Sequence, residues 1–202
     1  MPRAGLSTAA VVDAALALVD EKGADALTLA AVAARTGVAT PSLYKHVRSL
    51  DALQQKVSAV ATGELAQELA AAAAGRAASD ALRACAHAYR GYAQRRPGRY
   101  PATQRVPDPA DSVHLEAGNR AVQTLFAVLG GYGLAGDELL DATRILRSAL
   151  HGFVSLEHSG GFGIPHDLDI TFDRLVGSLD IAFRQWGAQS GRQPGRGVST
   201  GR

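Results

Sequence analysis

The sequence predicts an all-α protein, and three observations carry this prediction. Hydrophobic residues make up 47% of the 202 positions and aromatic residues only 5%, while alanine, the best helix former, is abundant and β-branched runs are scarce. Apolar residues recur every three to four positions in one segment after another, which is the period of an amphipathic helix. Glycines such as Gly23, Gly37 and Gly75 separate these segments, where helices are expected to end.

Composition limits the class of protein. The chain is long enough for one or two domains with a sizeable core, and its net charge of +2 does not by itself announce a nucleic-acid binder, so any basic surface must be local. The single Cys85, expected in the core, cannot form an internal disulfide. Asp13 and Asp20 interrupt the N-terminal apolar run, and no later segment has the apolar length of a membrane span. We therefore expect a cytoplasmic protein that does not enter a membrane.

Three short helices are expected in residues 1–50. Ser7 or Thr8 can cap the first, which runs to about Lys22, and Thr28 can cap the second. Helical spacing predicts one small shared core made of Val11, Val12, Ala15, Leu16, Val19, Leu29, Val32, Ala33, Leu43 and Val47. These helices would form a compact N-terminal domain.

The stretch from Gly37 to His46 predicts a tight turn followed by a short helix. Gly37 follows a helical run and can adopt the left-handed conformation that ends it. Thr40 is expected to cap a new helix with Pro41 in its first position, where a missing N–H costs nothing. This arrangement is the helix-turn-helix, whose second helix enters the major groove of DNA by its N-terminal end.

Only helices are expected after this domain. Ser49 precedes a long fourth helix to about Ala74, and further helices are predicted at about residues 79–95, 111–129, 137–158 and 169–186. Residues 51–187 are therefore assigned to a second helical domain. Residues 188–202 have no apolar periodicity and are rich in Gly, Ser, Gln, Pro and Arg, which predicts a disordered tail.

With a helix-turn-helix near its N-terminus and helices alone after it, the chain resembles the TetR family of bacterial repressors. The matching stretches are Thr28 to Ala33, Gly37-Val38 and Ser42 to Val47, and residues 37–53 are the most specific part. The later stretch Ser148 to Phe153 is similar to the Trp-His-Gly motif of one class of TetR C-terminal domains, with Leu150 at the tryptophan position.

This resemblance implies a homodimer with a small-molecule pocket in each C-terminal domain, which serves ligand binding and dimerisation. Filling of the pocket by an unidentified ligand would release a near-palindromic operator. The predicted pocket residues, which can equally be ordinary core, are Tyr89, Tyr92, Phe126, His151 and Phe153. The last two long helices would form the dimer interface. The predicted interface residues lie on apolar stripes that can instead face the subunit's own core. They are Leu146, Leu150, Val154, Leu175, Leu179 and Phe183.

The predicted contacts to double-stranded DNA are Thr28, Arg35, Thr40, Pro41, Ser42, Tyr44, Lys45, His46 and Arg48. Lys45 is the best candidate for a guanine edge, because lysine pairs with the O6 and N7 acceptors. The Tyr44 hydroxyl suits a phosphate, although a half-buried core tyrosine is the alternative. Where the family often has a phosphate-binding lysine, this chain has Leu50, so either Arg48 replaces that contact or one contact is missing.

No cofactor, metal or enzymatic activity is predicted. The histidines lack the pairing of a zinc motif, and no Gly-x-Ser-x-Gly elbow, phosphate loop, dinucleotide fingerprint or paired-carboxylate site occurs. We expect a dimeric transcriptional regulator that acts as a repressor. Leu50 and the modest charge keep one alternative open, a helical dimer that binds a ligand or a protein and has lost specific DNA binding.

Overall fold

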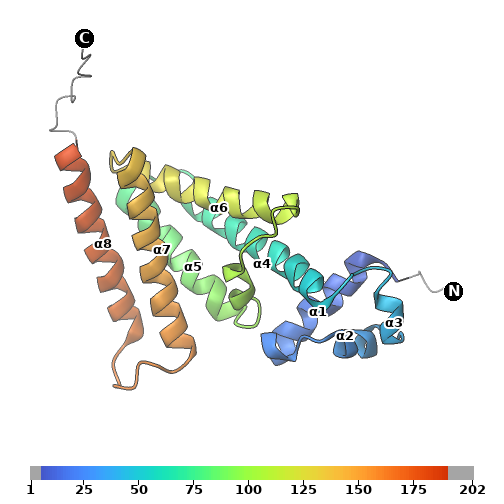
Figure 1. Ribbon diagram of the computed structural model, residues 1–202. Helices are drawn as coiled ribbons and strands as arrows, with labels where there is room; N and C mark the ends of the chain where they lie inside the picture. Colours follow the sequence, from blue (N-terminus) through green and yellow to red (C-terminus); the bar gives the residue numbers. More distant parts are fainter. Residues whose placement is uncertain (1–5, 191–202) are drawn as a thin grey trace, which may run out of the picture. The chain divides into compact units, whose positions relative to one another are not determined.

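The computed structural model describes residues 6–190, and every regular element in that range is helical (Figure 1). This confirms the predicted all-α class. The elements in chain order are α1 Thr8–Lys22, η1 Ala24–Ala26, α2 Leu29–Thr36, α3 Thr40–Leu43, α4 Leu50–Ala73, α5 Ala78–Arg95, η2 Tyr100–Gln104, α6 Ser112–Gly130, α7 Gly136–His158 and α8 Leu168–Ser190, where η marks a 3-10 helix. In this part of the chain no helix is long and apolar enough to span a bilayer.

The chain divides into two compact units. The first comprises Met1–Leu69 with Tyr89–Ala121, and the second comprises Ala70–Ala88 with Val122–Arg202. This division differs from the predicted boundary at residue 50, because Leu53 and Val57 of α4 complete the core beneath α1, α2 and α3. At the other end α8 continues through residues 188–190, and residues 191–202 of the predicted tail lie outside the described residues.

Side-chain caps start three of the helices in the first unit. The Ser7 hydroxyl accepts from the N–H of Ala10 at 3.1 Å, and Thr28 accepts from Ala31 at the same distance. Ser49 caps α4 by accepting from Ala52 at 3.0 Å. Each cap satisfies a backbone donor that the first turn of a helix leaves unpaired. Thr28 caps α2 as predicted, and of the two candidates for α1 the cap is Ser7.

The core under these helices agrees with the apolar pattern. Nine of the ten residues predicted for it are buried and Leu29 is partly buried against them. At Gly37 the backbone is left-handed, with φ +71°, and the N–H of Val38 donates to the carbonyl of Ala33 at 3.1 Å. The glycine therefore turns the chain sharply from α2 toward α3, as its position predicted.

The third helix corrects the prediction in two respects. Ala39 and not Thr40 is the N-cap residue, and no side chain caps this helix. The helix also ends at Leu43, after four residues, and the N–H groups of His46 and Val47 both donate to the Leu43 carbonyl, at 2.8 and 2.9 Å. Tyr44, Lys45 and His46 therefore lie in a turn that follows the helix, because these converging bonds close the backbone around Leu43.

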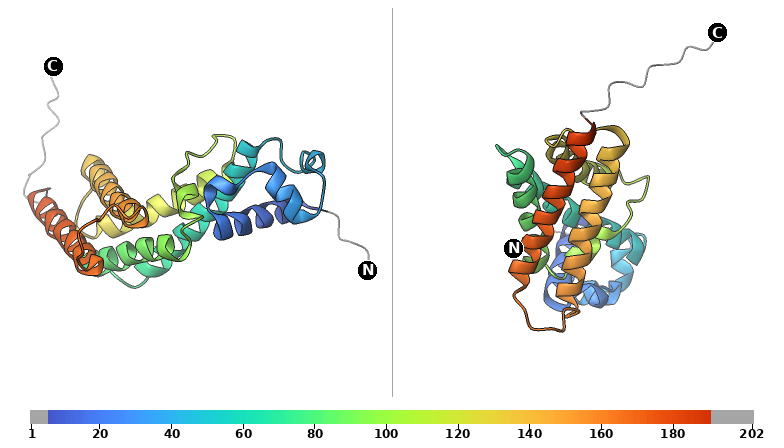
Figure 2. Two further views of the ribbon diagram at one scale, coloured as in Figure 1. Left: turned by 90° about the horizontal axis from the view of Figure 1, so that it is seen from below. Right: turned by 90° about the vertical axis from the view of Figure 1, so that its left-hand side faces the viewer.

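Aromatic side chains fill the second unit. In it α7 and α8 run side by side in opposite directions (Figure 2). The ring centroid of Phe153 lies 5.0 Å from those of both Phe162 and Phe172. In a second group the ring centroid of Phe183 of α8 lies 5.9 Å from that of Tyr132 and 6.1 Å from that of Trp186.

Cys85 is buried in α5, as expected, and burial raises the pKa of its thiol to about 11.

This packing corrects most of the predicted dimer interface. Leu146, Leu150, Val154 and Phe183 are buried inside the protomer, and Leu175 and Leu179 are partly buried. A side chain already covered within one chain has no area left to offer a partner, so the first four belong to the subunit's own core. The large apolar side chains that α7 and α8 do expose are Leu140, Ile145, Leu156, Ile170 and Ile181.

Candidate nucleic-acid interface

Residues 40–46, here called the recognition segment, expose polar side chains above an apolar base. Leu43 and Val47 are 0% and 3% exposed and anchor the segment in the core. Tyr44 is 56% exposed and Lys45 is exposed beside it. The alternative of a half-buried core tyrosine is therefore wrong, and both side chains are free of the core that fixes their backbone.

The other residues predicted to contact DNA are at least partly exposed. Thr40, Ser42 and His46 are half-buried, and Pro41 and Arg48 are exposed. Because Thr40 does not cap α3, its hydroxyl is not committed to the helix end. Thr28 is exposed at the N-terminus of α2, where its own side chain already serves as the cap. Their contacts to DNA stay predictions.

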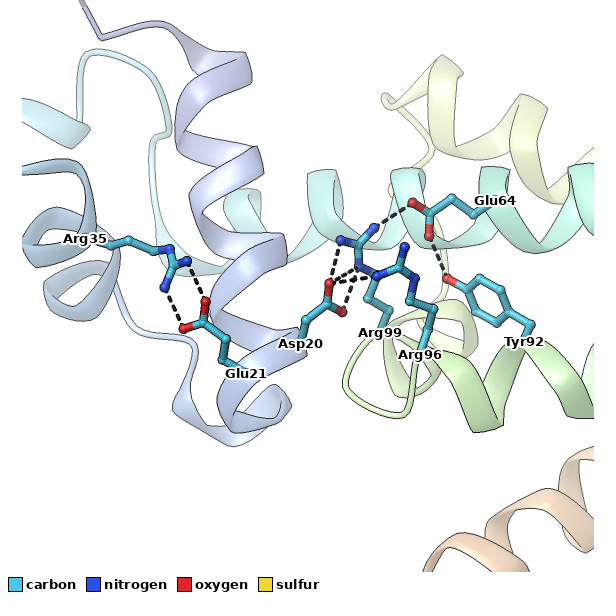
Figure 3. A network of polar contacts seen from close by, with 7 residues as sticks. All are labelled: Asp20, Glu21, Arg35, Glu64, Tyr92, Arg96 and Arg99. Atoms are coloured by element: carbon cyan, nitrogen blue, oxygen red, sulfur yellow. Dashed lines mark hydrogen bonds and ion pairs between the residues drawn. The ribbon is translucent and has the colours of Figure 1, made fainter.

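Arg35 is held by a carboxylate of its own domain. Its two terminal nitrogens donate to both oxygens of Glu21 at 2.7 and 2.6 Å (Figure 3). This hydrogen bond raises the pKa of Arg35 and lowers that of Glu21. A phosphate would therefore have to compete with a bidentate partner for Arg35.

Leu50 serves the core. It is the first residue of α4 and packs, partly buried, against the cluster that includes Leu53 and Val57. The apolar side chain therefore closes the core at the position where the family often has its phosphate-binding lysine. Arg48 is exposed two residues earlier and is the nearest cation to that position in sequence.

A network of charged side chains joins α1, α4 and the turn after α5, and sequence reasoning did not find it (Figure 3). Arg99, between α5 and η2, donates to Asp20 of α1 and to Glu64 of α4. Burial works against the charge of Arg99, but the hydrogen bond to Asp20 and the charges of Glu64 and Asp20 raise its pKa overall. Arg96 also donates to Asp20, at 3.3 Å.

The predicted pocket residues do not fall in one compact unit. Tyr89 and Tyr92 belong to the first unit, and Phe126, His151 and Phe153 belong to the second. The hydroxyl of Tyr92 donates to Glu64 at 3.0 Å, and burial together with that carboxylate raises the pKa of this tyrosine. The Tyr89 hydroxyl lies 2.9 Å from that of Tyr100. Both tyrosines are therefore part of a polar core, whichever of the five residues contact a ligand.

His114 is a second buried polar centre of the first unit. Its Nε2 lies 3.0 Å from the Ser58 hydroxyl and its Nδ1 lies 3.0 Å from Oε1 of Gln55. Burial, aided by the charge of Arg105 and opposed by that of Asp111, lowers the pKa of the imidazole. Among residues 6–190, no group of three His, Cys, Asp or Glu side chains is arranged to hold a metal ion.

The geometry defines the class of protein: a three-helix helix-turn-helix unit with an exposed recognition segment, followed by helices. Two family models match the chain. The one described as "Bacterial regulatory proteins, tetR family" covers residues 11–57, and the one described as "Tetracyclin repressor-like, C-terminal domain" covers residues 82–179.

Curated relatives and a solved structure agree with this class. The chain is 42% identical to an uncharacterized HTH-type transcriptional regulator of Mycobacterium tuberculosis, Rv0681, over 86% of this chain and 79% of that protein. It is 31% identical to YobS, an uncharacterized HTH-type transcriptional regulator of Bacillus subtilis, over 83% and 87%. A TetR variant from Acinetobacter baumannii, solved in complex with minocycline, has the same fold, with a TM-score of 0.69 and 22% identity over 91% of this chain and 99% of that one.

The chain therefore belongs to the TetR family of helix-turn-helix transcriptional regulators. The expected resemblance to the family is confirmed for both parts of the chain. The narrower resemblance to the Trp-His-Gly class stays a prediction.

Proposed function

We propose that the chain is a dimeric repressor that binds a near-palindromic operator and leaves it when a small molecule binds. The observation that carries this proposal is the recognition segment, in which Tyr44 and Lys45 are exposed above buried Leu43 and Val47. One such segment makes too few base contacts for operator affinity, so two copies are needed. A two-fold dimer would place them about 34–36 Å apart, one turn of DNA.

The dimer is proposed to form through α7 and α8. Both helices expose large apolar side chains, and Ile145 and Ile181 are among them. Exposed apolar area is favourably buried against a second copy of the same surface. Repression would follow from exclusion of RNA polymerase at the bound operator.

Release by a ligand is proposed from the family. The TetR variant of A. baumannii was solved with minocycline, and we carry over from it only that a small molecule binds. A ligand shifts the equilibrium toward a state that cannot bind the operator only if it binds that state more tightly.

DNA binding is tested by selecting bound duplexes from a random pool with the full-length protein. Recovery of a near-palindromic sequence, with an affinity that falls steeply as salt is added, supports the regulator. Lys45→Ala should relax the preference for one base by about 1–3 kcal/mol, because a side chain that reads a base edge is lost. Tyr44→Phe should weaken binding to all sequences alike. No enrichment over non-specific sequence, or equal loss of base preference in both variants, contradicts the proposal.

Dimerisation is tested by sedimentation of variants with a charge on the exposed apolar surface. Ile145→Glu and Ile181→Glu, each alone, should shift the protein toward a monomer, because the carboxylate would be desolvated in the interface. Val113→Glu is the matched control, since Val113 is more exposed than either isoleucine but lies on α6. A dimer that survives both isoleucine variants, or is lost in the control, argues against this interface.

A further inference from the structure

We propose that Arg99 is the positioning residue that fixes the angle of α1, α2 and α3 on α4, by binding α1 and α4 at the same time. Its guanidinium lies between two carboxylates that come from different helices, Asp20 of α1 and Glu64 of α4 (Figure 3). The inference rests on the proposed function, because this angle sets how two recognition segments meet one operator.

The contacts of Arg99 are numerous and directional. Its Nε donates to Oδ1 of Asp20 at 2.9 Å and its Nη2 donates to Oδ2 at 2.7 Å. Its Nη1 donates to Oε1 of Glu64 at 2.6 Å. The side chain is only 13% exposed, so water competes little for these donors. A planar guanidinium can serve two carboxylates in this way only within a narrow range of positions and angles.

Both carboxylates are held by further partners. Glu64 uses its second oxygen to accept from the hydroxyl of buried Tyr92 on α5 at 3.0 Å. Asp20 also accepts from Arg96 at 3.3 Å. Neither acid can turn toward water without losing a second hydrogen bond. The network therefore joins α1 to α4 through Arg99, and α4 to α5 through Glu64 and Tyr92.

A backbone contact reinforces the ionic one. Gly98 lies so close to the last turn of α1 that a Cβ there would overlap the carbonyl oxygen of Val19. Glycine is needed at this position because no side chain fits between the two backbones. The turn that carries Arg99 thus rests directly on α1, next to Asp20.

The position of α1 determines the position of the recognition segment. Val19 lies in the same buried cluster as Val32, Leu43 and Val47, so α1, α2 and α3 form one packed body. This body is attached to α4 a first time through Leu53 and Val57 of that helix. One apolar attachment would leave a pivot, because hydrophobic contact has little directional preference.

Arg99 supplies the second attachment. Glu64 lies seven residues beyond Val57, which is about 10 Å farther along the helix axis. Two attachments separated by this distance resist a change of angle that one attachment would permit. Loss of the ionic attachment should therefore change how strictly the two recognition segments are spaced, more than it changes whether the domain folds.

The test compares Arg99→Met with Arg95→Met in the full-length protein. Arg95 pairs with Glu68 and so also links α5 to α4, but that pair does not include α1. Methionine keeps much of the apolar stem and removes the charge in both variants. Each protein is titrated with the selected palindrome and with the same half-sites placed one base pair closer together or farther apart.

The expected result is a loss of spacing preference in Arg99→Met alone. Wild type and Arg95→Met should prefer the selected spacing by about tenfold or more, because half-site separation follows from dimer geometry. In Arg99→Met this preference should fall to about threefold or less, as the helices can adjust to each duplex. The preference is a ratio measured on one sample, so a loss of folded protein cancels. A wild-type preference in Arg99→Met overturns the proposal.

Amide hydrogen exchange of the free protein separates this inference from the proposed function. Residues 19–23, the last turn of α1 and the glycine after it, should exchange about tenfold faster in Arg99→Met and in the milder Asp20→Asn, and at the wild-type rate in Arg95→Met. If wild type selects no palindrome, the proposed function fails, and exchange alone then supports or overturns the anchoring of α1. Unchanged exchange in both Arg99→Met and Asp20→Asn overturns it.

Discussion

The two compact units differ in the contacts that join their distant segments. In the first unit charged and polar side chains meet, with Arg99 on Asp20 and Glu64, and His114 beside Ser58. In the second unit aromatic rings meet, with Phe172 against Phe153 and Phe183 against Tyr132. Polar contacts also occur in the second unit, where Ser79 and Tyr132 both donate to Asp180, but its largest buried side chains are apolar.

This difference has a physical consequence for a regulator. Hydrogen bonds between charged groups hold only within a narrow range of distance and angle, so a small shift breaks them as discrete events. The stabilisation that buried rings supply decreases with the apolar area exposed and the volume left empty, and it does not depend on the direction in which the rings move. The segments within the first unit are therefore joined in part by contacts that break as discrete events, and the segments within the second unit mainly by contacts that weaken gradually.

The largest expected effect is on the aromatic core. Phe172→Ala should lower the free energy of unfolding by about 3–5 kcal/mol, because Phe172 is fully buried and its removal leaves a cavity. Phe172→Leu is the matched control and should cost less than about 1.5 kcal/mol, because most of the volume is kept. Denaturant unfolding at one fixed protein concentration measures both values. Equal costs for the two variants would mean that this core tolerates empty volume, and the contrast between the units would weaken.

A smaller effect concerns helix caps in the first unit. Thr28→Ala should cost about 1 kcal/mol, because the Thr28 hydroxyl caps α2. Thr40→Ala should cost much less, since Thr40 caps nothing in α3. Denaturant unfolding of the two variants tests whether Ala39 or Thr40 is the N-cap residue of α3. A larger cost for Thr40→Ala would restore Thr40 as the cap.

The smallest expected effect is a pH dependence caused by His114. Burial lowers its pKa in the folded state below the ordinary 6.5, so on acidification the unfolded chain takes up a proton that the folded chain does not. Stability should therefore fall as the pH drops below about 6.5, by at most about 1.4 kcal/mol per pH unit. The measurement is the free energy of unfolding between pH 7.5 and 5, a range of about two and a half units chosen around the ordinary pKa.

The variant His114→Gln should reduce that slope, because the titrating group is removed. His166→Gln is the control, since His166 is exposed in the loop between α7 and α8 and its removal leaves the buried imidazole in place. A wild-type slope in His114→Gln would assign the acid sensitivity to another group.

Much of the fold could be predicted because its signals are local. The hydroxyls of Ser7, Thr28 and Ser49 each accept from a backbone N–H three residues later in the chain, and Gly37 turns the chain between two adjacent helices. The exposure of Tyr44 and Lys45 follows from the burial of Leu43 and Val47 at helical spacing. The exact start of α3 was missed because Ala39 has no capping side chain to signal it.

Four of the six predicted interface residues lie in the protomer's own core for a reason of geometry. Leu146, Leu150 and Val154 form a clear apolar stripe, but a helix with neighbours on two sides has two apolar faces, and spacing alone does not say which neighbour each face meets. In this chain the continuous apolar stripe packs into the protomer's own core. More scattered positions, Ile145 and Ile181 among them, are left exposed.

The sequence by itself determined that this protein is a chain of helices with a helix-turn-helix at its N-terminus, since caps, glycine turns and periodicity act over a few residues. Only the tertiary structure decided what Arg99 does, because Asp20 lies 79 residues earlier in the chain. Asp20 and Glu21 look alike in the sequence, yet Glu21 binds Arg35 within the helix-turn-helix and Asp20 binds Arg99 beyond it. Which arginine meets which carboxylate depends on how packed helices bring them together, and no local pattern records that.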